Sequence, residues 1–215
     1  DVRHAALDDL RSDPRFQDLY EYDVRTGSSR RLWEASGSLA VALATRDHRR
    51  FVLLDTLSDV DSNLYLLDLR KGTRPRLLTP HKGTVLHAPM DFSQDGRTLY
   101  LTSDAGGEFQ ALEALDLATG KQRTVLSESW DVFGAGFSPR YHWFWTGVND
   151  DGLPRTTLSS ARTHRPLTLP VAPGVSTSSE PQAVRPAALA AAMTASMARR
   201  RFMAARIIRD AVAAG

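Results

Sequence analysis

Hydrophobic and polar residues alternate with a period of two along several short segments of this chain. In the segment Leu19–Val24, for example, Tyr20, Tyr22 and Val24 are separated by single residues. Such alternation is typical of a β-strand, whereas a helix places apolar residues three or four positions apart. The pattern predicts that residues 16–170 are nearly all β, with any substantial helix near the two ends of the chain.

The same strand pattern returns at a spacing of about 45 residues, and each copy is followed by a turn. The three clearest copies are Leu19–Gly27, Leu64–Gly72 and Leu112–Gly120. A less similar fourth copy runs from Leu158 to His164. A second element, clearest in Phe92–Thr102, precedes the later copies and carries its own Asp-Gly turn. A period near 45 with four short strands is typical of the blades of a β-propeller.

The turn chemistry supports this reading. Asp23, Asp68 and Asp116 each stand just before a turn that ends at glycine. Glycine takes positive φ at little cost, and an Asp side chain accepts hydrogen bonds from nearby backbone N–H groups. His48 and His164 occupy the glycine positions of two further turns, so we expect both to adopt positive φ.

Counting these units gives about three and a half blades. The last half of one blade covers Leu19–Trp33, two whole blades cover about residues 38–79 and 85–126, and most of another covers about 131–169. A closed propeller has typically about 4 to 8 blades. The sequence therefore predicts either an incomplete ring or the loss of blades.

The expected domain organisation has three parts. Residues 1–15 form a lead-in segment, in which Ala5–Arg11 is expected to be a short helical turn, and residues 16–170 form the partial propeller. Residues 171–215 are a linker and an Ala/Arg-rich tail, helical or disordered, in which the repeat stops. Three explanations stay open for the tail: a natural terminal helix, a boundary at which the gene ends, or a shifted reading frame.

Composition excludes several classes of protein. Cysteine is absent and the formal net charge is only +2, so disulfides, thiolate zinc sites and a general nucleic-acid surface are not expected. No run of 18 or more apolar residues exists, so no membrane span is expected. The chain begins at Asp1 and is expected to be an excerpt of a longer product. The compartment stays open between cytoplasm and periplasm, in a bacterial-type protein.

At this point the residues resemble a known family. His81–Val85, Phe92–Gly96, Leu99–Asp104 and Leu115–Gly120 are similar to blades in the propeller of S9-type prolyl oligopeptidases. They are similar also to the WD40-like repeats of TolB-like periplasmic propellers. The resemblance covers Phe16–Pro170, and in the peptidases it implies a propeller that caps an α/β-hydrolase domain and restricts access to short peptides.

The resemblance carries over no catalytic residue. The family's Gly-x-Ser-x-Gly elbow is absent, and the nearest string, Gly136–Arg140, lacks the final glycine and falls on a blade turn. The expected function is that of a non-catalytic segment that gates peptide access and docks on the hydrolase domain of a parent serine peptidase. The alternative is a TolB-like propeller acting as a protein-interaction platform. A hydrolase domain in the parent chain would support the first, and a small α/β domain before the propeller would support the second.

No catalytic, cofactor or metal residue is assigned. Asp59, Asp61 and Asn63 have the spacing that opens a calcium loop, but Leu64 stands where the loop needs glycine, so the segment is interpreted as a hairpin turn. The histidines are not expected to form a metal site, and His81 and His87 are not expected to face one site. The six are His4, His48, His81, His87, His142 and His164.

Two further groups of residues are interpreted structurally. One is a dense set of aromatic side chains, for which packing between blades is preferred over a ligand platform: Trp130, Phe133, Trp143, Phe144 and Trp145. The other is the strand carboxylates Glu21 and Glu113, interpreted as solvated edge positions rather than as holders of a peptide amine. The Arg-rich tail is assigned no function.

Overall fold

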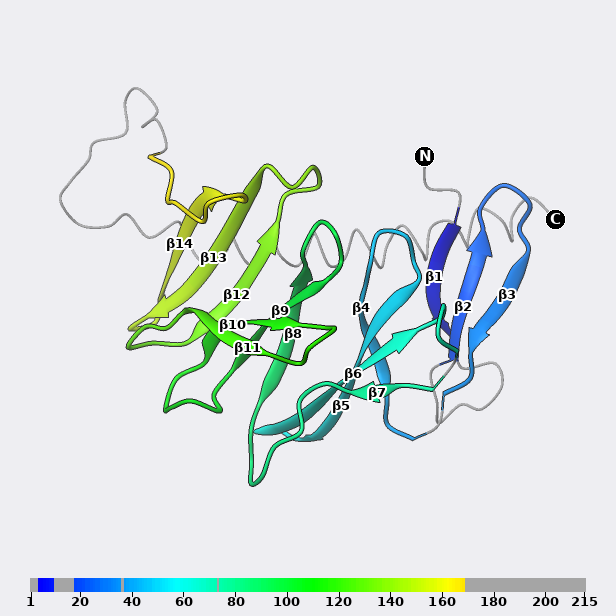
Figure 1. Ribbon diagram of the computed structural model, residues 1–215, viewed down its shortest axis with the longest axis horizontal. Helices are drawn as coiled ribbons and strands as arrows, with labels where there is room; N and C mark the ends of the chain where they lie inside the picture. Colours follow the sequence, from blue (N-terminus) through cyan, green and yellow to red (C-terminus); the bar gives the residue numbers. More distant parts are fainter. Residues whose placement is uncertain (1–3, 10–17, 36, 73, 169–215) are drawn as a thin grey trace. The chain divides into compact units, whose positions relative to one another are not determined.

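The computed structural model describes residues 4–9, 18–35, 37–72 and 74–168 (Figure 1). All regular structure in these ranges is antiparallel β-strand, and none of it is helix. The strands form four sheets, and the chain divides into two compact units. Each sheet corresponds to one predicted blade, and the blades are numbered 1 to 4 in chain order.

Unit 1 contains blade 1 and most of blade 2. Blade 1 has the strand order β1-β2-β3 and blade 2 the order β4-β5-β6-β7, so each strand pairs with its neighbour in sequence. The tip of the β5–β6 hairpin, Leu57–Leu64, groups with unit 2. The strands are β1 His4–Asp9, β2 Asp18–Asp23, β3 Ser29–Trp33, β4 Ala40–Ala44, β5 Arg50–Ser58, β6 Asp61–Asp68 and β7 Arg76–Leu77.

The core of unit 1 lies between its two blades. Leu19 and Trp33 from blade 1 pack in one cluster with Phe51, Leu53 and Leu67 from blade 2. These side chains are at most 4% exposed. Phe51 and Leu53, two residues apart on β5, therefore face blade 1, as the period of two requires, while Val52 between them is also buried.

Unit 2 contains blades 3 and 4 together with the β5–β6 tip. Blade 3 has the order β11-β10-β9-β8 and blade 4 the order β12-β13-β14. Pro166 adds an isolated bridge to Ser159 beside β14, in the position of a fourth strand. The strands are β8 His87–Phe92, β9 Thr98–Ser103, β10 Ala111–Asp116, β11 Gln122–Leu126, β12 Val132–Phe137, β13 Trp143–Asp150 and β14 Leu153–Ser160.

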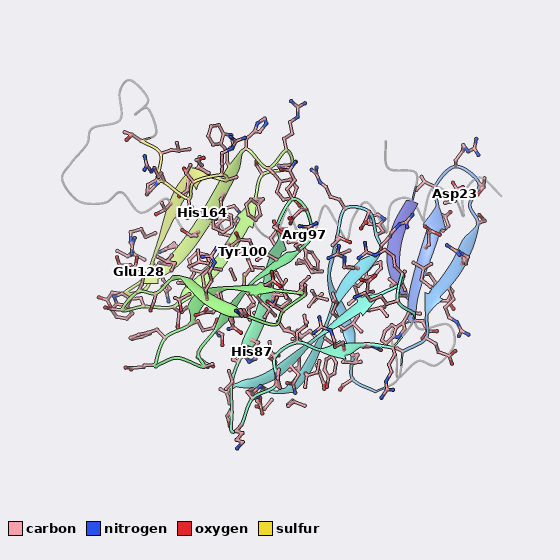
Figure 2. The ribbon with its side chains drawn as sticks, in the orientation of Figure 1. Asp23, His87, Arg97, Tyr100, Glu128 and His164 are labelled. Carbon is pink, nitrogen blue, oxygen red and sulfur yellow. The ribbon has the colours of Figure 1, made fainter. Side chains whose placement is uncertain are left out.

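The core of unit 2 repeats the same arrangement. Tyr100 and Leu112 from blade 3 pack with Val132, Phe144 and Val148 from blade 4. Phe144 is 1% exposed and its ring centroid lies 5.2 Å from that of Tyr100, which is labelled in Figure 2. Aromatic and aliphatic packing between consecutive blades therefore holds this unit together.

The predicted turn chemistry is confirmed. The Asp116 carboxylate accepts hydrogen bonds from the backbone N–H groups of Ala118 and Thr119 at 3.0 and 2.7 Å, and Gly120 has φ of 72°. These hydrogen bonds, with that from the Thr119 hydroxyl, hold the pKa of Asp116 below its usual value. His48 and His164, at the glycine positions of two other turns, have φ of 51° and 53° as expected.

One local prediction is wrong. Ala5–Arg11 was expected to form a helical turn, but His4–Asp9 is strand β1, paired with β2 from His4 opposite Asp23 to Asp9 opposite Asp18. Pairing with a neighbouring strand overrides the intrinsic helix preference of an Ala-rich segment. Blade 1 therefore has three strands among the described residues. The expected tail, residues 171–215, lies outside the described part of the chain.

Candidate functional site

One end of unit 2 gathers the hairpin tips and the connections between blades, and we call it the hairpin-tip end. It comprises the β5–β6 tip, the connection Leu78–Leu86 that leads into β8, and the loops around Asp104, Glu128 and Asp151. Backbone hydrogen bonds tie these loops together: Ser62 N–H donates to Val85 O at 3.0 Å. Because the strands of each blade run antiparallel, the hairpin between its second and third strands lies at the same end as the connection to the next blade.

His81 lies on the connection Leu78–Leu86 and bridges it to the β5–β6 tip. Its Nδ1 lies 2.9 Å from the carbonyl oxygen of Thr79, and its Nε2 lies 2.9 Å from Oδ1 of Asp61. Both neighbours are acceptors, so both ring nitrogens donate when the imidazole is protonated. The hydrogen bond to Thr79 O and then the Asp61 carboxylate raise the pKa of His81, and burial opposes them.

His87 begins β8, and its ring centroid lies 5.2 Å from that of His81 (Figure 2 labels His87). The residue is only 4% exposed, and neither ring nitrogen has a hydrogen-bond partner among the described residues. Burial, and after it the charge on His81, lower the pKa of His87 to about 4. His87 is therefore neutral at physiological pH.

The Ser62 hydroxyl fastens the β5–β6 tip to the edge of blade 3. It accepts a hydrogen bond from His87 N–H at 2.8 Å and donates one to His87 O at 2.7 Å. Because β8 is an edge strand of its sheet, these two backbone groups point away from the ladder and need another partner. Ser62 is 1% exposed, so this hydroxyl supplies that partner in place of water.

The sequence reasoning about these histidines was wrong. His81 and His87 were not expected to face one site, yet their rings meet. The segment between them is irregular, so strand alternation does not set the direction of either ring. The hairpin reading of the calcium-like segment is confirmed, because Asp59 and Val60 form the turn between β5 and β6 and Asp61 pairs with His81.

The rest of the hairpin-tip end is acidic and partly apolar. Four large apolar side chains there are 37 to 58% exposed: Leu57, Val60, Trp130 and Leu153. Its acidic residues are Asp59, Asp61, Asp104, Glu108, Glu128, Asp131, Asp150 and Asp151, and its basic residues are Lys82 and Arg155. Arg155 pairs with Glu128 and Asp150, each at 3.3 Å. These four side chains lie on the β5–β6 tip, the β11–β12 connection and the start of β14, so exposed apolar surface is spread over the loops of this end.

The aromatic set mostly packs within the protein. Phe144 faces blade 3, while Trp143, one residue earlier, is 46% exposed. The indole of Trp145 lies over Gly136 on the paired strand, where an added Cβ would stand 2.9 Å from its Nε1. Gly147 is covered by the ring of Phe133 in the same way. Packing between blades is therefore supported for Phe144, whereas Phe133 and Trp145 pack on glycines of the paired strands within blade 4.

The remaining sequence candidates take part in local contacts. Glu21 pairs with Arg30 across blade 1 at 2.7 Å, and Glu113 accepts a hydrogen bond from Thr124 across blade 3 at 2.8 Å. Ser138 lies in the β12–β13 turn, and its hydroxyl oxygen accepts from the N–H groups of His142 and Trp143, each at 3.1 Å. A strand–turn–strand setting is not that of a nucleophile elbow, which needs a strand leading into a helix.

His164 closes the opposite end of unit 2 and was predicted only as a turn residue. Its ring packs on Phe144, with centroids 4.9 Å apart, and Nε2 lies 3.5 Å from the Tyr100 hydroxyl (Figure 2). Burial, and after it the charge on Arg123, lower the pKa of His164. A histidine at this turn thus adds an aromatic contact that glycine would not supply.

The described residues contain no group of three or more His, Asp or Glu side chains placed to hold a metal ion. Within the same ranges, no helix is long and apolar enough to cross a membrane.

Comparison with solved structures identifies the architecture. The chain superposes on TolB from Acinetobacter baumannii with a TM-score of 0.54 and 19% identity, over 76% of this chain and 40% of that one. It superposes on prolyl oligopeptidase B from Galerina marginata with a TM-score of 0.59 and 11% identity, over 80% of this chain and 26% of that one. The fold is that of a β-propeller. Blades 2 and 3 each have the four strands that the sequence predicts.

Comparison of sequences gives a peptidase relative. The chain is 26% identical over 121 residues to dipeptidyl aminopeptidase BIII from Pseudoxanthomonas mexicana, over 54% of this chain and 17% of that protein. No family model matches the chain. The chain thus spans a minor part of the length of these relatives, and it is similar both to S9-type peptidases and to TolB propellers.

Proposed function

We propose that this chain is a non-catalytic propeller segment of an S9-like serine peptidase, which gates peptide access and docks on an α/β-hydrolase domain of the parent chain. The observation that carries the proposal is the sequence similarity to dipeptidyl aminopeptidase BIII, which accompanies a propeller fold similar to that of prolyl oligopeptidase B. In the proposed organisation, residues 16–170 are the propeller part and residues 171–215 are a linker and tail.

The hairpin-tip end supports a docking role. Leu57, Val60, Trp130 and Leu153 expose apolar surface there beside a largely acidic set of side chains. Exposed apolar side chains favour contact with another protein surface. Gating follows from size, because an opening bounded by blade edges admits an extended peptide and rejects a folded domain.

The proposal assigns no catalytic residue to this chain. Ser138, the serine of the nearest elbow-like string, uses its hydroxyl oxygen as an acceptor for two backbone N–H groups inside a β-turn. Acyl transfer needs a nucleophile with an adjacent base and oxyanion donors, and this turn offers neither a helix N-terminus nor that geometry. The hydrolysis is therefore assigned to the parent's hydrolase domain.

The test uses the parent protein and a variant lacking residues 16–170. Both are assayed with a short chromogenic peptide, with a long unstructured peptide that contains the same cleavage sequence, and with a folded protein that displays it. The proposal expects the deletion to raise cleavage of the folded protein relative to the short peptide at least tenfold. Equal size preference in the two proteins would refute gating, and a parent without a hydrolase domain would refute the peptidase assignment.

A second function rests on the propeller fold that the chain shares with TolB from Acinetobacter baumannii. In this alternative the propeller is a rigid platform for protein binding. A small α/β domain preceding the propeller in the parent chain, with no hydrolase after it, would support the platform.

A further inference from the structure

Two imidazole rings meet where three separate segments of unit 2 come together. The β5–β6 tip supplies Asp61 and Ser62, the connection Leu78–Leu86 supplies His81, and β8 supplies His87. The tip is held to the connection by the Asp61–His81 pair and to β8 by the two hydrogen bonds of Ser62. The histidine pair is therefore built into the contact between the hairpin tip and blade 3.

The charged groups around His87 come from every segment packed against it. His81 faces it from the connection, Asp61 from the hairpin tip, and Asp104 from the loop after β9. Asp104 is also engaged locally, because its Oδ1 accepts a hydrogen bond from Leu86 N–H at 2.9 Å. His87 is 4% exposed, and neither of its nitrogens has a hydrogen-bond partner among the residues described. A proton added to His87 would place an unpaired charge in a buried position.

We propose that the His81–His87 pair is a pH-sensitive latch, which holds the β5–β6 tip and the connection Leu78–Leu86 against blade 3 near neutral pH and releases them on acidification. The inference does not depend on the proposed peptidase function. It assigns a conformational role to the segments that carry Leu57 and Val60, both exposed at the hairpin-tip end. Acidification would thus change the shape of this surface.

The two histidines act in opposite directions. The pKa of His87 is lowered in the folded state to about 4, so its contribution to stability is present above the ordinary histidine value of about 6.5 and is lost as the pH falls towards 4. The pKa of His81 is raised, so its contribution is present below about 6.5 and is lost as the pH rises through the folded value. Between pH 7.5 and 5, His87 drives release and His81 opposes it.

The test is hydrogen exchange of the 215-residue chain at pH 7.5 and 5, corrected for the intrinsic exchange rate, with peptides covering residues 57–64 and 78–87. Peptides from β12 and β13 in the same sample serve as an internal reference. For a group shifted from 6.5 to about 4, linkage gives a loss of protection of up to about thirtyfold at pH 5. We expect the wild type to lose about fivefold or more, because His81 opposes part of this loss.

His87→Gln removes the titrating ring. In this variant, the hydrogen-exchange protection of residues 57–64 and 78–87 should not fall between pH 7.5 and 5. An NMR titration of the His87 ring in the wild type provides a readout that needs no variant, and it should show the ring still neutral at pH 5.5. The latch is refuted if His87→Gln loses protection as the wild type does. It is refuted equally if the His87 ring in the wild type titrates at or above pH 6.5.

Discussion

Replacing Ser62 with alanine removes a hydroxyl that serves two backbone groups of the next blade. Ser62 Oγ accepts from His87 N–H at 2.8 Å and donates to His87 O at 2.7 Å. In Ser62→Ala both backbone groups lose this partner at a position that is 1% exposed. Leaving one buried polar group unsatisfied costs about 1–3 kcal/mol, so we expect the contact between the hairpin tip and β8 to weaken by about 2–4 kcal/mol.

Hydrogen exchange measures this loss directly, because the reporting amides belong to the contact. A change of about 2–4 kcal/mol corresponds to a fall in protection of roughly thirtyfold to several hundredfold at His87 and Ser62. Peptides from blade 4 should change much less, since the core around Phe144 does not involve this hydroxyl. The experiment runs on the full chain at low concentration, because unpaired strand edges favour association.

Ser129→Ala is the matched control. Ser129 is exposed and lies in the β11–β12 connection, so the same substitution there should leave exchange within about threefold of the wild type. The reasoning fails if Ser62→Ala keeps His87 protection within that same threefold range. Such a result would mean that water or a shifted backbone satisfies the edge of β8 as well as the hydroxyl does.

Other expected outcomes concern the core, the turns and the absent chemistry. Phe144→Ala should cost about 3–5 kcal/mol, read as a shift in the urea midpoint; a loss below about 1 kcal/mol would contradict the core assignment. His48→Gly should stabilise by about 0.5–1 kcal/mol by relieving positive φ, and Gly72→Ala, at φ of 110°, should destabilise; the opposite order in thermal melts would contradict the turn argument. The purified chain should hydrolyse no peptide or ester. Activity that titrates with a serine-directed inhibitor would contradict this prediction. Light scattering should show association, and a monodisperse, sharply melting monomer would refute it.

Strands and turns were predictable because their causes are local. The strand predicted at Leu19–Val24 and the Asp-to-Gly turn of Asp116–Gly120 depend on residues a few positions apart. Both are confirmed, although Val24 lies in the turn after β2 and is 37% exposed. Strand β1 was missed for the opposite reason. His4–Asp9 has none of the β-branched residues or of Phe, Tyr and Trp, which favour strands, and it is placed by pairing with residues 9 to 19 positions further along the chain.

The histidines illustrate both cases: some are placed by local turn geometry and one by contacts with residues distant in the sequence. His48 and His164 were predicted correctly as turn residues, because the φ of a residue is set by the turn in which it sits. The position of His87 was not predicted. Its burial and its contact with His81 depend on Ser62 and Asp61, about 25 residues earlier, and on an irregular segment. No periodicity links these positions, so only the folded chain brings them together. It follows that a propeller's blades can be inferred from its repeat, whereas a site at the hairpin-tip end depends on the loops in which the repeat is weakest.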